Sequence, residues 1–434
     1  MGTGTEGMIA AGRRKKTMTR KNFSPGRRET LKASVALASG VALGFPAILR
    51  AQSEAIRVGH LTPRTGFLGQ IGEYGYRGAV LAMEEANAAD GVLGRKIELI
   101  AEDSVNPATA VSKAQKLYER DQVIASVGEI NSASVAAIAQ VAARMKRMHF
   151  NTGGNSDEVR GKNCNRYLFH VEGNNTMYVR TIGQWLKEAK RIVGKRFHFL
   201  VADYAFGHDL YRASSQFLKD NGGLEAGKDL IATNTQDFSA YILKIRQSKP
   251  DFVFSCLAGI DITNFIRQYR EYDLPFEVTG GANDTGLFWA AGIDSLSGYW
   301  QTMWYHGIDV PSARGFVSRF RARYQMPPEN GAWADYVAMR ILLQAIAETR
   351  STDAEKLIAY FDKGASFDVL KGRRGMFAAN HQLLQEMYVV RIKEKSRMQD
   401  QWDIFEMVRA VPGASDPLTL IQPSQQENPC PIAG

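Results

Sequence analysis

Two short polar runs stand where ligand chemistry is expected in this chain of 434 residues. The first, 127–132, reads Val-Gly-Glu-Ile-Asn-Ser and leads from an apolar stretch into a helical pattern, with Asn131 or Ser132 as the N-cap. Unpaired backbone N–H groups and a hydroxyl at such a helix start suit a carboxylate. The second run, 151–156, reads Asn-Thr-Gly-Gly-Asn-Ser and follows the next expected strand. Both runs predict an anion site; the alternative is that Ser132 and Asn155 only cap helices.

The other motifs predict neither a cofactor nor a metal. Gly69, Gly72 and Gly75 are spaced G-x-x-G-x-x-G, unlike a dinucleotide-binding loop, so we interpret them as a turn that allows close strand–helix contact. The seven histidines are scattered, with no i, i+4 pair typical of zinc ligands, and neither a nucleophile elbow nor a Walker loop is present. We therefore expect no cofactor, no metal and no enzymatic activity.

Regular alternation of strands and helices supplies the elements that position these residues. In the first half we expect strands at 56–61, 97–102, 123–127 and 148–151 and helices at 76–87, 108–120 and 134–145. The same alternation begins again in the second half, with strands expected at 196–202, 251–257 and 276–279 and helices at 176–190, 208–221, 238–248 and 262–271. Two amphipathic helices are expected after it, at 313–324 and 333–348. This pattern predicts an α/β protein with two doubly wound, Rossmann-like lobes; one large sheet is the alternative.

The first 53 residues have the features of an export signal. Arg27 and Arg28 precede Leu31, Lys32 and a short apolar run, which is typical of a twin-arginine signal peptide. An ordinary secretory signal is the alternative, and a membrane anchor is disfavoured because glycine and proline interrupt the run. We expect cleavage after residue 51 or 53 and a periplasmic location.

Most of the formal charge of +9 belongs to this leader. Residues 1–53 hold ten Lys or Arg and two Glu, which leaves 44 basic and 43 acidic residues in the remainder. The remainder is therefore nearly neutral, and the basic excess gives no reason to expect nucleic-acid binding.

The three cysteines lack the spacing of a metal site. Cys256 lies in an apolar run and is expected to be a buried free thiol. In an oxidising compartment Cys164 and Cys430 are then expected to pair and to hold the C-terminal tail.

Several segments together resemble the opening and middle of the branched-chain amino-acid-binding family, the solute-binding proteins of ABC importers. These segments are 61–69, 78–87, 90–98, Asp103, 106–107, 128–134, 203–207 and 237–239. The resemblance implies two Rossmann-like lobes that clamp a ligand in the cleft between them, joined by three hinge crossovers. We place the crossovers near 170–172, 302–304 and 374–377. The lobes are then 54–171 with 304–374 and 172–303 with 375–415, followed by an irregular tail at 416–434.

The resemblance also implies roles for individual residues. Ser132 beside Asn131 would hold a ligand carboxylate, helped by Asn155, and the Gly153 carbonyl would accept from an ammonium. The remaining expected cleft residues are the aromatic side chains Phe67, Tyr204 and Phe206 and the pair Asn283 and Asp284.

The chain departs from the family where an acidic residue usually binds the ligand ammonium. Residues 280–284 read Gly-Gly-Ala-Asn-Asp, which puts Ala282 nearest that position. Either Asp284 takes the role or the ligand lacks an ammonium, since a buried unpaired ammonium is costly. Whether Asp284 or Glu129 faces the cleft stays open. The expected function is an ABC importer's periplasmic receptor for a branched-chain or other amino acid, with an aromatic carboxylate as the alternative ligand.

The expected partners are the small-molecule ligand and ABC permease subunits in the inner membrane, and the receptor is expected to be a monomer. A sensory subunit of the same fold is one alternative. An enzyme on a doubly wound fold is the other, and it would need a polar catalytic set in the cleft.

Overall fold

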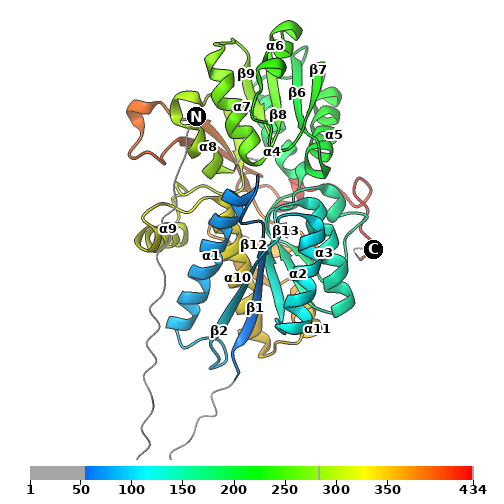
Figure 1. The fold of residues 1–434 in the computed structure, drawn as a ribbon, viewed down its shortest axis with the longest axis vertical. Helices are drawn as coiled ribbons and strands as arrows, with labels where there is room; N and C mark the ends of the chain where they lie inside the picture. The colour runs from blue at the N-terminus through cyan, green and yellow to red at the C-terminus, as the bar shows by residue number, and fades with distance from the viewer. Residues whose placement is uncertain (1–53, 282–283, 433–434) are drawn as a thin grey trace, which may run out of the picture. The chain divides into compact units, whose positions relative to one another are not determined.

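A computed structural model describes residues 54–281 and 284–432. The predicted signal peptide, its cleavage sites and Asn283 lie outside these residues. The described part contains two parallel sheets, each with helices on both faces, and a set of short antiparallel strands (Figure 1). Among the described residues no helix is long and apolar enough to span a bilayer.

The first sheet is five-stranded and parallel, with strand order β2-β1-β3-β4-β5. Its strands are β1 (Ile56–Thr62), β2 (Ile97–Asp103), β3 (Ala125–Gly128), β4 (Met148–Asn151) and β5 (Leu168–His170). The helices against it are α1 (Gly69–Ala88), α2 (Pro107–Gln115, continued by a π turn to Arg120), α3 (Ser132–Met145), α9 (Pro311–Tyr324), α10 (Asn330–Thr349) and α11 (Ala354–Asp362). Helices α1 and α10 pack on each other, as do α2 and α3.

The second sheet is four-stranded and parallel, with strand order β7-β6-β8-β9. Its strands are β6 (Arg196–Ala202), β7 (Leu224–Ile231), β8 (Phe252–Cys256) and β9 (Glu277–Gly280). Its helices are α4 (Asn175–Glu188), α5 (Ala205–Asp220), α6 (Ser239–Ser248), α7 (Gly259–Glu271) and α8 (Thr285–Ala291). Two such sheets confirm the predicted α/β class with two lobes, because apolar runs flanked by amphipathic helices are buried on both faces.

Two small antiparallel sheets follow that the sequence pattern did not predict. One has the order β10-β14-β15 and the other β11-β12-β13. Their strands are β10 (Tyr299–Thr302), β11 (Ser366–Asp368), β12 (Arg374–Phe377), β13 (Leu383–Leu384), β14 (Met387–Ile392) and β15 (Phe405–Val411). The β12 residue Phe377 contacts Phe169 of the first sheet, with ring centroids 5.1 Å apart. β12, which spans the crossover predicted at 374–377, thus contacts the first sheet.

The glycine-rich segment at 69–75 is helical, so its interpretation as a turn is wrong. It forms the first two turns of α1, which begins seven residues before the predicted start. The lack of a side chain at these glycines still allows close contact. A Cβ atom on Gly72 would lie 1.8 Å from the Pro63 carbonyl oxygen, and a Cβ atom on Gly78 would lie 2.0 Å from the Ala332 carbonyl oxygen. These glycines let α1 approach the end of β1 and the start of α10.

Replacing Gly78 with alanine is expected to lower the free energy of unfolding by about 1–3 kcal/mol, since the added methyl group meets rigid backbone. The matched control is Gly315→Ala in α9, where the Cβ meets only the flexible end of Arg319. That change should be neutral or stabilising by up to about 1 kcal/mol through helix propensity. Chemical denaturation followed by circular dichroism compares the two, and equal midpoints would contradict the close-contact argument.

The C-terminal tail is fastened to both lobes. Cys430 forms a disulfide with Cys164, across a sequence separation of 266 residues, while Cys256 is a buried free thiol. Asn428 Nδ2 donates to the Asp157 backbone oxygen at 2.8 Å, and Arg180 of α4 pairs with Glu427. Within its described residues, 416–432, the tail carries a 3₁₀ turn at Leu418–Ile421 and no other helix or strand.

Candidate functional site

A cavity lies where the carboxyl ends of the two parallel sheets meet, as expected for ligand sites of doubly wound folds. Its volume is about 30 Å³, so the space is narrow in this structure. Its lining comes from both lobes and comprises Thr62, Leu68, Ile71, Gly72, Gly75, Ile130, Thr152, Gly153, Asn155, Glu172, Tyr204, Phe206, Ala258, Asp284, Gly331 and Asp335.

Five of the residues predicted from the sequence line this cavity: Gly153, Asn155, Tyr204, Phe206 and Asp284. Each follows the carboxyl end of a parallel strand. A sixth, Phe67, lies beside them, because its ring meets Tyr204 edge-on with centroids 5.8 Å apart. These rings give one wall of the cavity an aromatic character.

Asn131 and Ser132 do not line the cavity. The Asn131 side chain accepts from the N–H groups of Ala133 and Ser134, so it caps α3. The Ser132 hydroxyl oxygen accepts from the Ser156 backbone N–H at 3.1 Å, and only 3% of the surface of Ser132 is exposed. In this structure both side chains organise the polar runs that carry Gly153 and Asn155.

Glu129 is likewise turned away from the cavity, whereas Asp284 lines it. One Glu129 carboxylate oxygen accepts from the Ser104 hydroxyl at 2.6 Å, and the other accepts from two backbone N–H groups. Burial raises the pKa of Glu129 to about 7, although these hydrogen bonds oppose the shift. Of the two candidates, Asp284 is therefore the one placed to meet a ligand.

Two further carboxylates line the cavity that sequence reasoning missed, Glu172 and Asp335. Asp335 pairs with the buried His60 ring, with 2.7 Å between Oδ2 and Nε2. Glu172 accepts from the Tyr178 hydroxyl and from Asn155 Nδ2. Each had a signal in the sequence: Asp335 is a charge on the apolar face of an expected helix, and Glu172 lies at an expected crossover.

Burial shapes the titration of the acidic groups here. Burial, and next the nearby Asp284 carboxylate, raise the pKa of Glu172 to about 8. Burial raises the pKa of Asp284 to about 6, against a hydrogen bond from Asn330 Nδ2 at 3.0 Å. Burial also holds the pKa of the neighbouring Glu329 well above its usual range, with Asp284 and Glu172 contributing. The cleft is thus acidic on both lobes.

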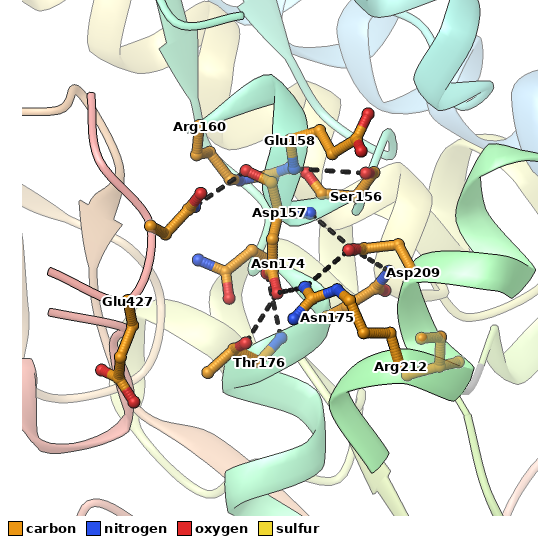
Figure 2. Close-up of polar contacts among 12 residues, drawn as sticks. Ser156, Asp157, Glu158, Arg160, Asn174, Asn175, Thr176, Asp209, Arg212 and Glu427 are labelled. Atoms are coloured by element: carbon orange, nitrogen blue, oxygen red, sulfur yellow. Dashed lines mark hydrogen bonds and ion pairs between the residues drawn. The ribbon is translucent and has the colours of Figure 1, made fainter. Parts of the chain in front are cut away.

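A second polar cluster joins the lobes outside the cavity (Figure 2). Arg212 of α5 pairs with Asp157 at 3.0 Å and with Asp209 at 2.7 Å. The Asp157 carboxylate also accepts from the Thr176 hydroxyl at 2.6 Å, and Asn175 donates to Asp209 at 2.8 Å. Burial and Asp209 raise the pKa of Asp157 to about 6. This cluster fixes the turn after β4 to the starts of α4 and α5.

Buried Arg160 ties the crossovers together. Its Nε donates to Gln382 Oε1 at 2.7 Å, and its terminal nitrogens donate to the carbonyl oxygens of Glu172 and Gly173 at 3.0 and 3.2 Å. Gln382 in turn donates to the Glu172 carbonyl at 2.8 Å. The backbone that carries Glu172 into the cavity is therefore held from two directions.

No group of three His, Cys, Asp or Glu side chains arranged to hold a metal ion occurs within residues 54–281 and 284–432. The polar groups of the cavity are thus acids, amides and hydroxyls, which bind by hydrogen bonding and charge.

Comparison with known proteins agrees with this arrangement. The profile of the periplasmic binding protein family matches residues 55–397. The chain belongs to the periplasmic binding protein family. It is 26% identical over 335 residues to a Leu/Ile/Val-binding protein homolog of Brucella suis, covering 74% of this chain and 83% of that protein.

Solved structures resemble this periplasmic binding protein along most of its length. A periplasmic binding protein from Burkholderia mallei has a TM-score of 0.80 at 25% identity, covering 88% of this chain and 99% of that one. A branched-chain amino acid ABC transporter periplasmic ligand-binding protein from Burkholderia xenovorans has a TM-score of 0.76 at 26% identity, covering 87% and 100%. A Rhodopseudomonas palustris solute-binding protein in complex with benzoate has a TM-score of 0.73 at 21% identity, covering 82% and 96%, and shares the fold.

Proposed function

We propose that this protein is the solute-binding component of an ABC importer and closes its lobes on a small amino acid. The observation that carries the proposal is an acidic, partly aromatic cavity lined by both lobes. The Leu/Ile/Val-binding relatives and the branched-chain amino acid transporter structure support the transport role.

Asp284 is proposed to bind the ligand ammonium, together with the Gly153 carbonyl. Asp284 follows β9 on the second lobe, and Gly153 follows β4 on the first, so one ammonium between them would link the lobes. A ligand that contacts both lobes stabilises the closed form by its greater affinity for that form. Asn155 remains a proposed contact for the ligand carboxylate, and Ser132, which does not line the cavity, is proposed to act only by holding the turn that carries Asn155. Phe67, Tyr204 and Phe206 are proposed to contact its side chain.

An aromatic carboxylate without an amine is the weaker alternative. Three carboxylates line the cavity, and no Lys or Arg is among its described lining residues. An anion would enter against these charges with no cation to meet it. The benzoate complex of the distant Rhodopseudomonas palustris protein keeps this ligand class among the compounds to be tested.

The receptor is proposed to work in the periplasm as a monomer, after export by the twin-arginine route, and to deliver its ligand to permease subunits in the inner membrane. The proposed hinges are the crossovers near 170–172, 302–304 and 385–386. A ligand-sensing subunit of the same fold is the alternative role. Genes for permease and ATPase subunits next to the gene for this protein would favour transport over sensing. The enzyme alternative would require turnover of the bound ligand.

The proposal is tested by native mass spectrometry of the exported protein, followed by a thermal-shift screen of amino acids and aromatic acids. An amino acid at 100 times its Kd is expected to add about 2.7 kcal/mol of stability. Asp284→Asn should weaken amino-acid binding at least tenfold, while Glu129→Gln, outside the cavity, should leave the Kd within about twofold. Absence of any small-molecule binding, or turnover of the ligand, would refute the receptor role.

A further inference from the structure

The cavity holds more carboxyl groups than one ammonium can pair with. Glu172, Asp284 and Asp335 line it, and the Asp335 carboxylate is paired with His60. Glu172 accepts its two hydrogen bonds on Oε1, and Asp284 accepts from Asn330 on Oδ1. Among the described residues, Glu172 Oε2 and Asp284 Oδ2 have no hydrogen-bond partner, although Glu172 is only 4% exposed. Two carboxylate oxygens are therefore available to a ligand.

The cations nearest these oxygens are bound to other groups. Arg160 has Nε on Gln382 and its terminal nitrogens on backbone carbonyls, and it does not line the cavity. Lys371 donates to the Glu386 carbonyl oxygen at 2.8 Å. Among the described residues, Glu172 and Asp284 thus each accept hydrogen bonds on one carboxyl oxygen and form no ion pair.

A zwitterionic ligand brings a single ammonium, which can pair with only one of these two carboxyl groups. Charges removed from water are tolerated in protein interiors when they are paired. A ligand with a second cationic group would leave a net positive charge to meet the second carboxylate.

Resting on the proposed receptor function, we propose that the cleft selects a ligand of net positive charge, a basic amino acid or related organic amine, whose cationic groups meet Asp284 and Glu172. Asp284 occupies the role expected from the family resemblance. Glu172 is the additional acid, and it would distinguish this receptor's ligand from leucine-like amino acids.

Isothermal titration calorimetry of the mature protein with lysine, arginine, leucine, putrescine and benzoate tests this assignment. Lysine, arginine or putrescine should bind at least tenfold more tightly than leucine and benzoate. Glu172→Gln, which keeps the shape of the side chain, should weaken the cationic ligands about 10–100-fold and leave the others within about threefold. The control Glu158→Gln removes an exposed carboxylate that pairs only with Lys162 and should change none of them.

Proton release gives an independent readout. Glu172 faces Tyr178, Asn155, Asp284, Glu329 and the more distant cations Arg160 and Lys371. Because burial and Asp284 raise the pKa of free Glu172 to about 8, it holds a proton near neutral pH, and a bound cation lowers that pKa. Binding should therefore release a proton and tighten as pH rises from about 6 to about 8. Titrations in buffers of different ionisation enthalpy measure this release, which Glu172→Gln should abolish.

The two proposals fail in different ways. Tighter binding of leucine or benzoate than of the cationic compounds, or unchanged affinity in Glu172→Gln, overturns the charge assignment and leaves the receptor function standing. If no compound binds and the exported protein carries no small molecule in native mass spectrometry, both proposals fall.

Discussion

Replacing Arg160 with methionine is expected to lower the free energy of unfolding by about 3–5 kcal/mol. The guanidinium is fully buried and donates to the Gln382 side chain and to the carbonyl oxygens of Gly154, Ser156, Glu172 and Gly173. Methionine fills similar space but removes a donor from each of these acceptors in a buried site, and an acceptor left without any donor there costs about 1–3 kcal/mol. Because Glu172 belongs to this backbone, ligand affinity should fall as well.

Arg166→Met provides the comparison for Arg160→Met. Arg166 forms ion pairs with Glu355 and Asp362, yet 45% of its side chain is exposed to solvent. Exposed pairs contribute little, so its removal should cost less than about 1 kcal/mol. Urea denaturation followed by tryptophan fluorescence measures both variants. Similar unfolding midpoints for the two variants would show that the buried Arg160 guanidinium contributes no more to stability than the exposed Arg166 guanidinium.

Replacing Cys430 with serine is the second large effect, an expected loss of about 2–5 kcal/mol in the free energy of unfolding. The disulfide to Cys164 closes a sequence separation of 266 residues, and long closed loops restrict the unfolded chain most. Without it the segment would depend on noncovalent contacts such as those of Asn428 and Glu427. The tail should then become accessible to proteases.

Reduction supplies the control for Cys430→Ser. Dithiothreitol should lower the midpoint of the unmodified protein to that of the variant and leave the variant unchanged, since Cys256 is buried and unpaired. Non-reducing peptide mapping should recover the fragments around Cys164 and Cys430 as one linked species. Recovery of both as free thiols would contradict the bond.

The parts of the fold that could be predicted from sequence are those with local signals. Apolar runs such as 196–202 and 252–256 are buried parallel strands, and amphipathic repeats mark the helices that cover them. The antiparallel strands near the C-terminus were missed because they are short, and the partner of β10 is also distant: Thr302 pairs with Tyr388. A short strand whose partner lies far along the chain leaves little periodic pattern.

The candidate site was predictable to the extent that its residues follow strands. Gly153, Asn155, Tyr204, Phe206 and Asp284 lie in such turns and line the cavity. Ser132 was predicted by the same reasoning, yet its side chain accepts from the Ser156 N–H outside the cavity lining. No local rule decides which way a side chain at a helix start turns. Asp335 reaches the cavity from α10, where only the approach of α1, permitted by Gly75, brings it close.

The bond at the C-terminal tail also constrains the order in which the molecule is completed. Cys430 is synthesised 266 residues after its partner Cys164, which is buried beside the first sheet. In the proposed twin-arginine route the chain folds where thiols stay reduced, so oxidation would come only after translocation. The bond would then seal an arrangement that noncovalent contacts had already built. Once sealed, a single backbone cut between the two cysteines leaves the pieces joined, so the receptor would tolerate proteolytic nicks that would otherwise separate its lobes.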